Sequence, residues 1–220
     1  HAVGFRRNQL KRFHDLLHDA AFFESEKAKV GKPETVWQRF FEANKWIFGY
    51  GLAYQAMGPL DGKALEQVVR GFSLTGPGKR TDAVMKTQGL VNSLCFVEIK
   101  HHNTSLLTKD AYRSGAWSPH AELVGGIAQV QATVQDAVET IVRKLEPTGD
   151  DGAPTGETLF NFEPRAFLVA GSLGQFETDA GINEQKFRSF ELFRRNTKRP
   201  EILTFDELYH RAKFIVEQDD

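Results

Sequence analysis

The spacing of apolar residues in the first 60 positions changes from helical to strand-like near residue 46. Over residues 5–30 apolar side chains recur three and four positions apart with charges between them, which predicts one helical segment. Lys32-Pro33 breaks this pattern, and Pro33 in a first-turn position opens a second helix through about Asn44. The second helix carries an apolar stripe of Val36, Trp37, Phe40 and Phe41.

A run of strands is expected after these helices. Short aromatic and apolar stretches that are interrupted by glycine and proline are typical of strands joined by turns. We expect strands over residues 46–57, 65–74, 81–87 and 94–100, with turns at 76–78 and 88–93. This order predicts antiparallel neighbours.

Helical spacing returns in the second half of the chain. Ser118-Pro119 is a helix start signal and predicts a long helix over residues 118–145. Residues 146–164, rich in Gly, Pro and acidic side chains, predict a surface loop, and the apolar run 165–171 predicts a buried strand. Further helices are expected at about 178–195 and 205–217. The inner face expected for the long helix comprises Val124, Ile127, Ala128, Gln129, Ala132 and Val138.

Composition narrows the class of protein. With 220 residues and 40% hydrophobic content, we expect one globular domain over residues 31–220, preceded by a helical segment over residues 1–30. The single cysteine, Cys95, excludes an internal disulfide and a cysteine-based zinc site. No apolar run approaches the roughly 20 residues of a membrane span, so we expect a cytoplasmic protein with no membrane partner. Because the chain begins with His1 rather than Met, we also expect a further domain upstream.

The formal net charge of -1 provides no global basic field for nucleic acid. A nucleic-acid partner would therefore need a local basic surface, for which the chain offers two clusters. The alternative for either cluster is a solvated helix face. The clusters are Arg6, Arg7, Lys11 and Arg12 near the start, and Lys186, Arg188, Arg194, Arg195, Lys198 and Arg199 near the end.

The residues best suited to catalysis lie on the expected strand 94–100. Because side chains alternate along a strand, Phe96, Glu98 and Lys100 share one face, and Cys95, Val97 and Ile99 share the other, which we expect to face a packed core.

The expected pairing of this strand with the preceding one brings a second carboxylate, that of Asp82, close to Glu98. If residues 88–93 form the turn of an antiparallel pair, Asp82 falls opposite Ile99, give or take one residue. Asp82 and Glu98 would then reach a common Mg²⁺ or Mn²⁺ ion, while Lys100 would stabilise an anionic transition state.

Each of these residues also has a plain structural explanation. A Glu-x-Lys pair on a solvent-facing strand is common, and Asp82 could simply pair with Lys100. His101-His102 could contact substrate or metal, or form a solvated turn, and the stretch from Gly76 to Arg80 could approach a phosphate or form a plain hairpin turn. Gln129 would either complete a hydrogen-bond network or point at Glu98.

The order of these motifs resembles the PD-(D/E)XK nuclease superfamily, and more narrowly the nuclease domain of the Shedu anti-phage defence proteins. The resemblance covers roughly residues 30–215. It is carried by four stretches: Pro33 to Asn44 with Trp46 to Gly49, Arg80 to Met85, Val97 to Lys100 followed by Thr104, and Glu122-Leu123 leading to Gln129.

The resemblance implies a fold of the α/β (α+β) class, with a mixed central sheet flanked by helices, and Mg²⁺-dependent cleavage or nicking of double-stranded DNA. It assigns Asp82 and Glu98 as metal ligands with the Ile99 carbonyl as a possible third, and Lys100 as the catalytic lysine. Glu34 matches an accessory acid of the superfamily, with Glu42 as the competing assignment.

The resemblance also assigns residues outside this core. Gln129 matches the glutamine of a Gln-x-x-x-Tyr-like helix motif, although position 133 is Thr rather than Tyr. Residues expected to contact DNA are Arg80, His101 and Arg113. The family further implies a homo-oligomer regulated by an upstream domain.

Two other functions remain open at this point. One is a DNA-binding or oligomerisation module that keeps the nuclease fold but is inactive without its upstream domain. The other is a metal-dependent RNase.

Overall fold

The computed structural model describes residues 2–44, 46–49, 57–59, 83–87, 92–146, 151–154, 156 and 158–218. Helices precede the strands in the first part of the chain, and strands and helices alternate in the second. The helices are α1 (Ala2–His18), α2 (Ala20–Val30), α3 (Pro33–Ala43), α4 (Trp46–Gly49), α5 (Ala121–Ile141), the 3-10 helix η2 (Leu173–Phe176), α6 (Glu184–Arg195) and α7 (Phe205–Gln218). The strands are β1 (Met57–Pro59), β2 (Ala83–Thr87), β3 (Asn92–Ile99), β4 (Lys144–Leu145), β5 (Leu159–Val169), β6 (Glu177–Thr178), β7 (Gly181–Ile182) and β8 (Glu201–Leu203).

Six of the described strands form a mixed sheet with β3 near its centre, and β6 and β7 form a separate antiparallel pair. The order of the six-stranded sheet is β1-β2-β3-β5-β4, and β8 pairs with the second half of β5. The pairs β1–β2 and β2–β3 are antiparallel, whereas β5 runs parallel to both β3 and β8. The antiparallel run predicted before residue 100 is therefore confirmed for its described strands.

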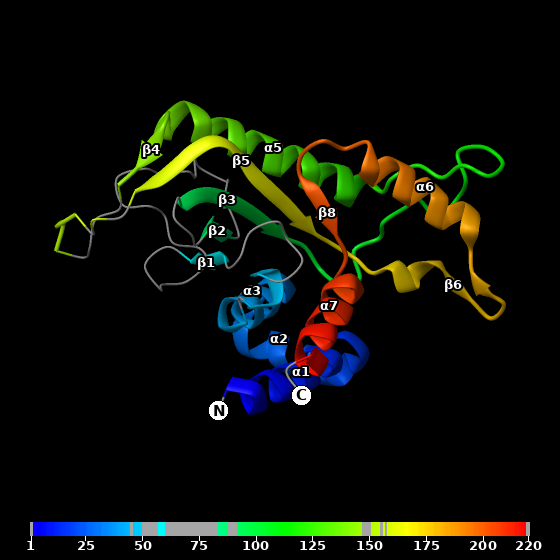
Figure 1. The fold of residues 1–220 in the computed structure, drawn as a ribbon. Helices are drawn as coiled ribbons and strands as arrows, with labels where there is room; N and C mark the ends of the chain where they lie inside the picture. The colour runs from blue at the N-terminus through cyan, green and yellow to red at the C-terminus, as the bar shows by residue number, and fades with distance from the viewer. Residues whose placement is uncertain are drawn as a thin grey trace.

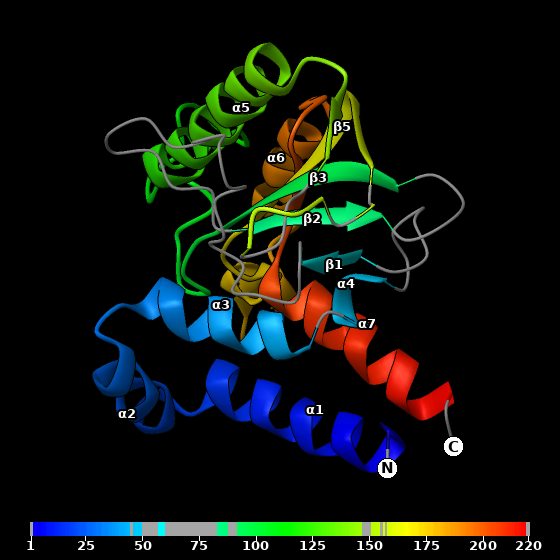
Figure 2. The ribbon, with the colours of Figure 1, turned by 90° about the vertical axis from the view of Figure 1, so that its left-hand side faces the viewer.

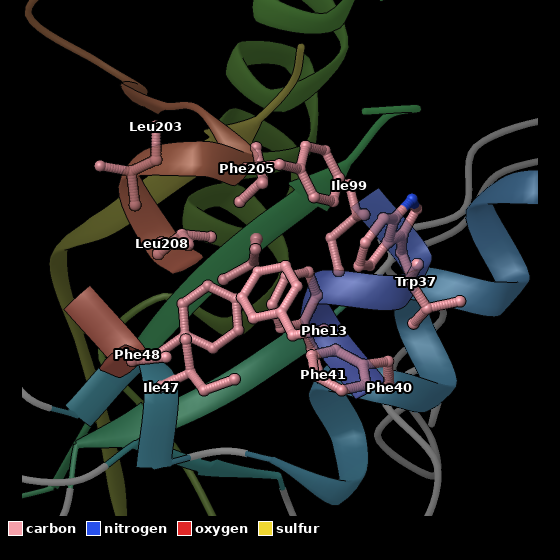
Figure 3. Close-up of a cluster of buried hydrophobic side chains, with 14 of the residues drawn as sticks. Phe13, Trp37, Phe40, Phe41, Ile47, Phe48, Ile99, Leu203, Phe205 and Leu208 are labelled. Atoms are coloured by element: carbon pink, nitrogen blue, oxygen red, sulfur yellow. The ribbon is translucent and has the colours of Figure 1, made fainter. Parts of the chain in front are cut away.

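Helices cover both faces of this sheet (Figures 1 and 2). One face of β3, formed by Cys95, Val97 and Ile99, packs into a cluster that also contains residues of α1, α2, α3, α4 and α7. Aromatic rings dominate this cluster, in which Trp37 of α3 lies 4.5 Å from the ring of Phe205 of α7 (Figure 3). The alternation predicted for β3 is confirmed on this face.

The opposite face of the sheet is covered by α5. Leu94 and Phe96, on the face of β3 that also carries Glu98, pack with Val130 and Val134 of α5. Farther along the sheet, Leu168 of β5 packs in a third cluster that includes residues of α5 and α6. Glu98 therefore lies between two layers of the molecule, where it is only 5% exposed.

The predicted helix over residues 5–30 is divided, and the predicted strand over residues 46–57 is wrong at its start. Asp19 interrupts the first helix, because its carboxylate accepts a hydrogen bond from Phe22 N and caps α2. Residues Trp46–Gly49 form the short helix α4. Ile47 and Phe48 are both fully buried in the same cluster. In a strand, two successive side chains would point to opposite faces of the sheet.

Three boundaries in the second half also differ from prediction. Helix α5 ends at Ile141 instead of 145, since Val142 adopts a positive φ of 61° and the chain enters β4. Strand β5 begins at Leu159, within the predicted loop, and a register shift against β3 accommodates the positive φ of Glu163. Helix α6 begins at Glu184 because the β6–β7 hairpin occupies the residues before it.

The expected inner face of α5 is wrong at two of its positions. Val124 and Ala128 are exposed, and Val138 is only partly buried. The buried stripe consists of Leu123, Ile127, Val130, Val134, Ala137 and Ile141.

At the level of fold class, a mixed sheet flanked by helices, the prediction is confirmed. The expected strand over residues 65–74 and the turn at 76–78 lie outside the described residues. So does the first part of the turn expected at 88–93, whereas its last two residues, Asn92 and Ser93, belong to β3. Within the described ranges, no helix is long and apolar enough to cross a membrane. Helix α1, part of the expected lead-in segment, packs against α7 through Phe13 in the first cluster; the domain boundary at residue 30 stays a prediction.

Candidate active site

The candidate site lies at the C-terminal end of β3, where the strand leaves the sheet. Glu98 pairs in parallel register with Leu168, and the main-chain nitrogen of Lys100 donates to Val169 O across 2.8 Å. His101 O then accepts hydrogen bonds from Thr104 N and Gly171 N at 3.0 and 3.1 Å. These hydrogen bonds hold the backbone around Lys100 against the end of β5. They therefore fix the position of the Cα atom from which the Lys100 side chain extends.

Lys100 joins β3 to α5 through two polar contacts. Its ammonium lies 3.4 Å from Glu98 Oε1 and donates a hydrogen bond to Gln129 Oε1 across 3.2 Å. The Glu98 side chain is 7% exposed and the Lys100 side chain 22%. A positive charge is therefore held beside a buried carboxylate, with part of the lysine open to solvent.

The close approach of α5 to Lys100 depends on Gly126. A Cβ atom at this position would lie 3.1 Å from Leu168 Cδ1 and 3.3 Å from Lys100 Cε. Those distances are shorter than ordinary van der Waals contacts, so a side chain here would move α5 or Lys100. The neighbouring Gly125 meets nothing within 4 Å.

Helix α3 approaches the other side of the residues that follow β3. Trp37 Nε1 donates a hydrogen bond to His102 Nδ1 across 3.1 Å, and the His102 ring stacks on that of His101 at 4.3 Å. Burial lowers the pKa of His102 to about 4 and also lowers that of His101, and the negative charge of Glu34 partly offsets the second shift. Glu34 therefore acts electrostatically on the turn after Lys100.

The competing accessory acid, Glu42, occupies the far end of the same helix. It lies eight residues after Glu34, which corresponds to about 12 Å along a helix axis. Because α3 presents its first turn to His101, the position of Glu34 is the better suited of the two. Its role as an accessory acid stays a prediction.

The structure brings together Glu98, Lys100 and Gln129, but it does not gather every residue expected at the site. Asp82 and Arg80 lie outside the described residues. Ile99 ends β3 with its side chain fully buried in the first cluster. Arg113 is exposed in a turn that packs against α6, since the carbonyl oxygen of Gly115 accepts a hydrogen bond from Arg188 across 2.8 Å. The hydrogen bond of this turn therefore ties Arg113 to α6, whereas Lys100 contacts α5.

The described part of the β2–β3 hairpin fixes the register on which the Asp82 assignment depends. Ala83 pairs with Val97 and Val84 with Phe96. The expected register, with Asp82 opposite Ile99, pairs each residue of β2 with the β3 residue one position later than observed. The observed register therefore agrees with the expectation, which allowed an error of one residue. Val84 is thus the backbone partner of Phe96, the residue two positions before Glu98 on the same face of β3.

Three contributors to the geometry were not anticipated. His102 was expected to contact ligand or solvent, whereas it accepts the hydrogen bond from buried Trp37. Gln38 of α3 is a buried polar residue, 7% exposed, one position after Trp37. The sequence does contain a signal for Gly126. Two adjacent glycines destabilise a helix, so their presence within a helical pattern suggests that one of them permits a close approach of another element.

Two oxygen-bearing groups lie at this strand end. The Glu98 carboxylate and the Ile99 carbonyl are both donors of the type that Mg²⁺ prefers. Among the described residues, no three His, Cys, Asp or Glu side chains are grouped so that they could hold a metal ion.

Two comparisons with known proteins bear on the identity of the chain. A Shedu protein SduA from Bacillus cereus (strain B4264) is 25% identical over 211 residues, which cover 95% of this chain and 52% of that protein. The chain thus spans about half the length of the curated relative that it matches. The family model described as Shedu protein SduA, C-terminal, matches residues 31–209. The chain belongs to the Shedu protein SduA C-terminal family.

Proposed function

We propose that the chain is the nuclease part of an anti-phage defence protein and cleaves phosphodiester bonds in double-stranded DNA in a Mg²⁺-dependent reaction. The observation that carries this proposal is the position of the Lys100 ammonium, 3.4 Å from Glu98 and 3.2 Å from Gln129 at the end of a central strand. A buried carboxylate beside a partly exposed lysine suits a reaction in which negative charge develops on a phosphate.

The fold supports assignment to the PD-(D/E)XK superfamily. In this proposal β3 is the strand of the Glu-x-Lys motif, between antiparallel β2 and parallel β5, and α5 supplies the glutamine. Helix α3 approaches from the other face and contributes Glu34 as an accessory acid. We propose further that the domain works as a homo-oligomer under an upstream regulatory domain.

The metal ligands in this proposal are Glu98, the Ile99 carbonyl and Asp82. Asp82 directly precedes Ala83 in the sequence. If the ladder in which Ala83 pairs with Val97 continued by one pair, the next pair would be Asp82 and Glu98. A bound Mg²⁺ or Mn²⁺ would supply Lewis-acid chemistry, lowering the pKa of a water and neutralising phosphoryl charge.

The residues of the chain have separate tasks. Lys100 offers a fixed positive charge to the non-bridging oxygens of the scissile phosphate. Gln129 orients that ammonium by accepting its hydrogen bond, and Glu98 lies beside it while serving as a ligand. Arg80, His101 and Arg113 are proposed contacts to the DNA backbone.

Plasmid nicking tests this function. Purified protein is incubated with supercoiled DNA in Mg²⁺ or in EDTA, and Lys100→Ala is compared with the wild type and with Lys144→Ala. Lys144 is an exposed lysine on β4 that pairs with Glu146, so its loss should leave the rate unchanged. We expect Lys100→Ala to lower the rate by about 100-fold or more.

Two outcomes would contradict the assignment. Equal nicking by the wild type and Lys100→Ala would remove Lys100 from the mechanism. A wild type that binds DNA but does not nick it in Mg²⁺ would favour a binding module on a nuclease fold. Parallel assays with labelled RNA decide between DNA and RNA as substrate.

A further inference from the structure

A groove of about 610 Å³ lies between α5 and the end of α6, apart from the candidate active site. One wall is a stripe of α5 that includes Val124, Ile127, Gln131 and Val134. Successive residues of an α-helix are turned by about 100°, so Gln131 points to nearly the opposite side of α5 from Gln129. The groove and Lys100 are thus on different flanks of the same helix.

The other wall is the segment from Phe193 to Arg199, which leads from α6 toward β8. Gln131 Nε2 donates a hydrogen bond to Arg199 O across 2.8 Å and holds this segment against α5. Thr197 Oγ1 donates to Phe193 O across 3.0 Å and fixes the turn after the helix. Both walls are therefore held in place by contacts within the described residues.

The cations of this C-terminal region fall into two groups. Arg194 lies 2.7 Å from both Glu191 and Glu207, and Arg195 lies 2.7 Å from Glu191, so their charges are neutralised. Lys198 and Arg199 line the groove. The Arg199 guanidinium donates a hydrogen bond to Pro164 O across 3.3 Å, and within the described ranges no carboxylate pairs with Lys198 or Arg199.

The groove also has no acidic side chain among its described lining residues. A smaller hollow of about 190 Å³ on the other side of Lys198 and Arg199 does contain carboxylates, those of Glu163 and Glu201. Two cations without a carboxylate in the groove therefore provide a net positive charge there, and that charge favours an anionic ligand.

The amide groups of the groove define a second chemical preference. The nitrogen atoms of Gln131, Gln135 and Asn196 each donate to an oxygen, those of Arg199 O, Glu139 Oε1 and Leu192 O respectively. Because all three partners are acceptors, the amide orientations are settled, and each amide oxygen is left as an acceptor. A ligand suited to these groups carries N–H donors.

The remaining surface of the groove is apolar. Val124 is 44% exposed, and Phe193 and Ile127 lie beside it. A flat ring with exocyclic amino groups could pack on the apolar residues and donate hydrogen bonds to the amide oxygens. A phosphate on the same ligand could pair with Lys198 and Arg199. The volume falls within the range of small-molecule sites, roughly 300–1,000 Å³, and exceeds the needs of a phosphate alone.

We propose that this groove binds a nucleotide unit, with its phosphate at Lys198 and Arg199 and an amino-bearing base over the apolar floor. Such a unit has two sources, a free nucleotide or an unpaired nucleotide within a nucleic-acid strand. The site goes beyond the proposed nuclease function, because binding here requires neither Lys100 nor a metal ion.

Calorimetric titration in EDTA tests the site with dAMP, dTMP, inorganic phosphate and the oligonucleotide (dA)6 as probes. We expect dAMP to bind with a Kd of about 1 mM or tighter, and dTMP and phosphate several-fold more weakly. The double variant Lys198→Ala/Arg199→Ala should weaken dAMP about tenfold. Lys213→Ala, which removes an exposed lysine of α7, should bind as the wild type does.

Two further titrations separate the groove from the candidate active site, and a free nucleotide from an unpaired strand. Lys100→Ala should bind dAMP unchanged, because its ammonium lies on the other flank of α5. An affinity for (dA)6 that exceeds that for dAMP about tenfold, with the same loss in the double variant, assigns the site to an unpaired strand. Equal affinities for the two assign it to a free nucleotide.

The proposal is overturned if dAMP does not bind, if phosphate binds as tightly as dAMP, or if the double variant binds dAMP as the wild type does. Val124→Glu provides an independent check, since it places a carboxylate on the floor without touching the cations. This variant should also weaken dAMP. A monomer–dimer change in sedimentation caused by Val124→Glu, without any dAMP binding by the wild type, would instead identify the groove as an interface between copies.

Discussion

Trp37 donates a hydrogen bond from its indole Nε1 to Nδ1 of His102 across 3.1 Å, and both side chains are buried. The acceptor nitrogen cannot carry a proton, so His102 is neutral and holds its proton on Nε2. Burial is the main cause that lowers the pKa of His102 to about 4, and the charges of His101 and His18 act in the same direction. This bond fastens α3 to the chain two residues after Lys100.

Acid should therefore destabilise the fold through His102. Its folded-state pKa lies below the ordinary value of 6.5, so the unfolded chain binds more protons between pH 6.5 and about 4. Stability from this group is complete above pH 6.5 and is lost as the pH falls through that window, by on the order of 2 kcal/mol. Urea unfolding at a series of pH values measures the slope.

His102→Gln should flatten this dependence, because an amide oxygen accepts the Trp37 bond without titrating. The matched control is His210→Gln, since His210 is exposed on α7. An unchanged slope in His102→Gln would show that other groups cause the acid sensitivity.

The two adjacent glycines of α5 should respond oppositely to added side chains. Gly126→Val pushes methyl groups against Leu168 and the Cε atom of Lys100, so we expect a loss of about 2 kcal/mol and a slower nicking rate. Gly125→Ala meets nothing within 4 Å and should stabilise the helix by about 0.5–1 kcal/mol. Thermal unfolding and plasmid nicking on both variants provide the comparison.

If Gly126→Val retained both the stability and the activity of the wild type, the close packing of α5 on Lys100 would not matter. A loss of activity in Gly125→Ala would instead indicate that the exposed side of α5 takes part in the reaction.

The strand that carries the candidate site could be predicted because its alternation is strict. Cys95, Val97 and Ile99 lie on one face as expected. The layer of α5 over Glu98 could not be predicted from the sequence of β3 alone. Phe96 on that face favours burial, whereas the charged Glu98 and Lys100 on the same face favour exposure. Only the packing of α5 shows that the charged face is covered.

Predictions failed where tertiary contacts override local pattern. The sequence of α5 offers apolar residues around much of the helix, and the side that is buried is the one on which Gly126 comes close to Leu168 and Lys100. The start of β5 was hidden because Glu163 and Pro164 are typical of loops, whereas a bulge accommodates them within the strand. The contact between Trp37 and His102 joins residues 65 positions apart and left no local signal.

Arg194 should contribute far more stability than the adjacent Arg195. Arg194 is 12% exposed and makes two hydrogen bonds to Glu207 at 2.7 and 2.8 Å, whereas Arg195 is 78% exposed. Arg194→Met leaves Glu207 without its cationic partner and should cost about 3 kcal/mol in urea unfolding, against about 0.5 kcal/mol for Arg195→Met.

The loss in Arg194→Met should shrink in acid. Burial opposes ionisation of Glu207, but hydrogen bonds from Arg194 and Thr204 outweigh it and lower its pKa below 4.5. Stability from a group with a lowered pKa is present above 4.5 and lost as the pH falls through the folded-state value. Equal costs for Arg194→Met and Arg195→Met at pH 7 would show that the buried pair adds nothing.

Cys95 should be almost inert toward thiol reagents while the sheet is intact. Burial in the centre of β3 raises the pKa of this thiol to about 12, although Arg165 partly opposes the shift. Because the thiolate is the reactive form, the native protein at pH 8 should be labelled on the order of a thousandfold more slowly than the unfolded chain. Exclusion of the reagent from the core should slow it further.

Since Cys95 is the only cysteine in the sequence, its labelling reports on one position without background. Protein in buffer and in guanidinium chloride is treated with a chromogenic disulfide, and the absorbance is followed in time. Release of one equivalent should be complete within the mixing period only in denaturant. The strand is the one that carries Glu98 and Lys100, so slow labelling in buffer measures how seldom the sheet opens at the candidate site. Fast labelling of a protein that still shows native circular dichroism would mean that β3 is accessible in the folded state, and the packing of both helical layers on it would then be wrong.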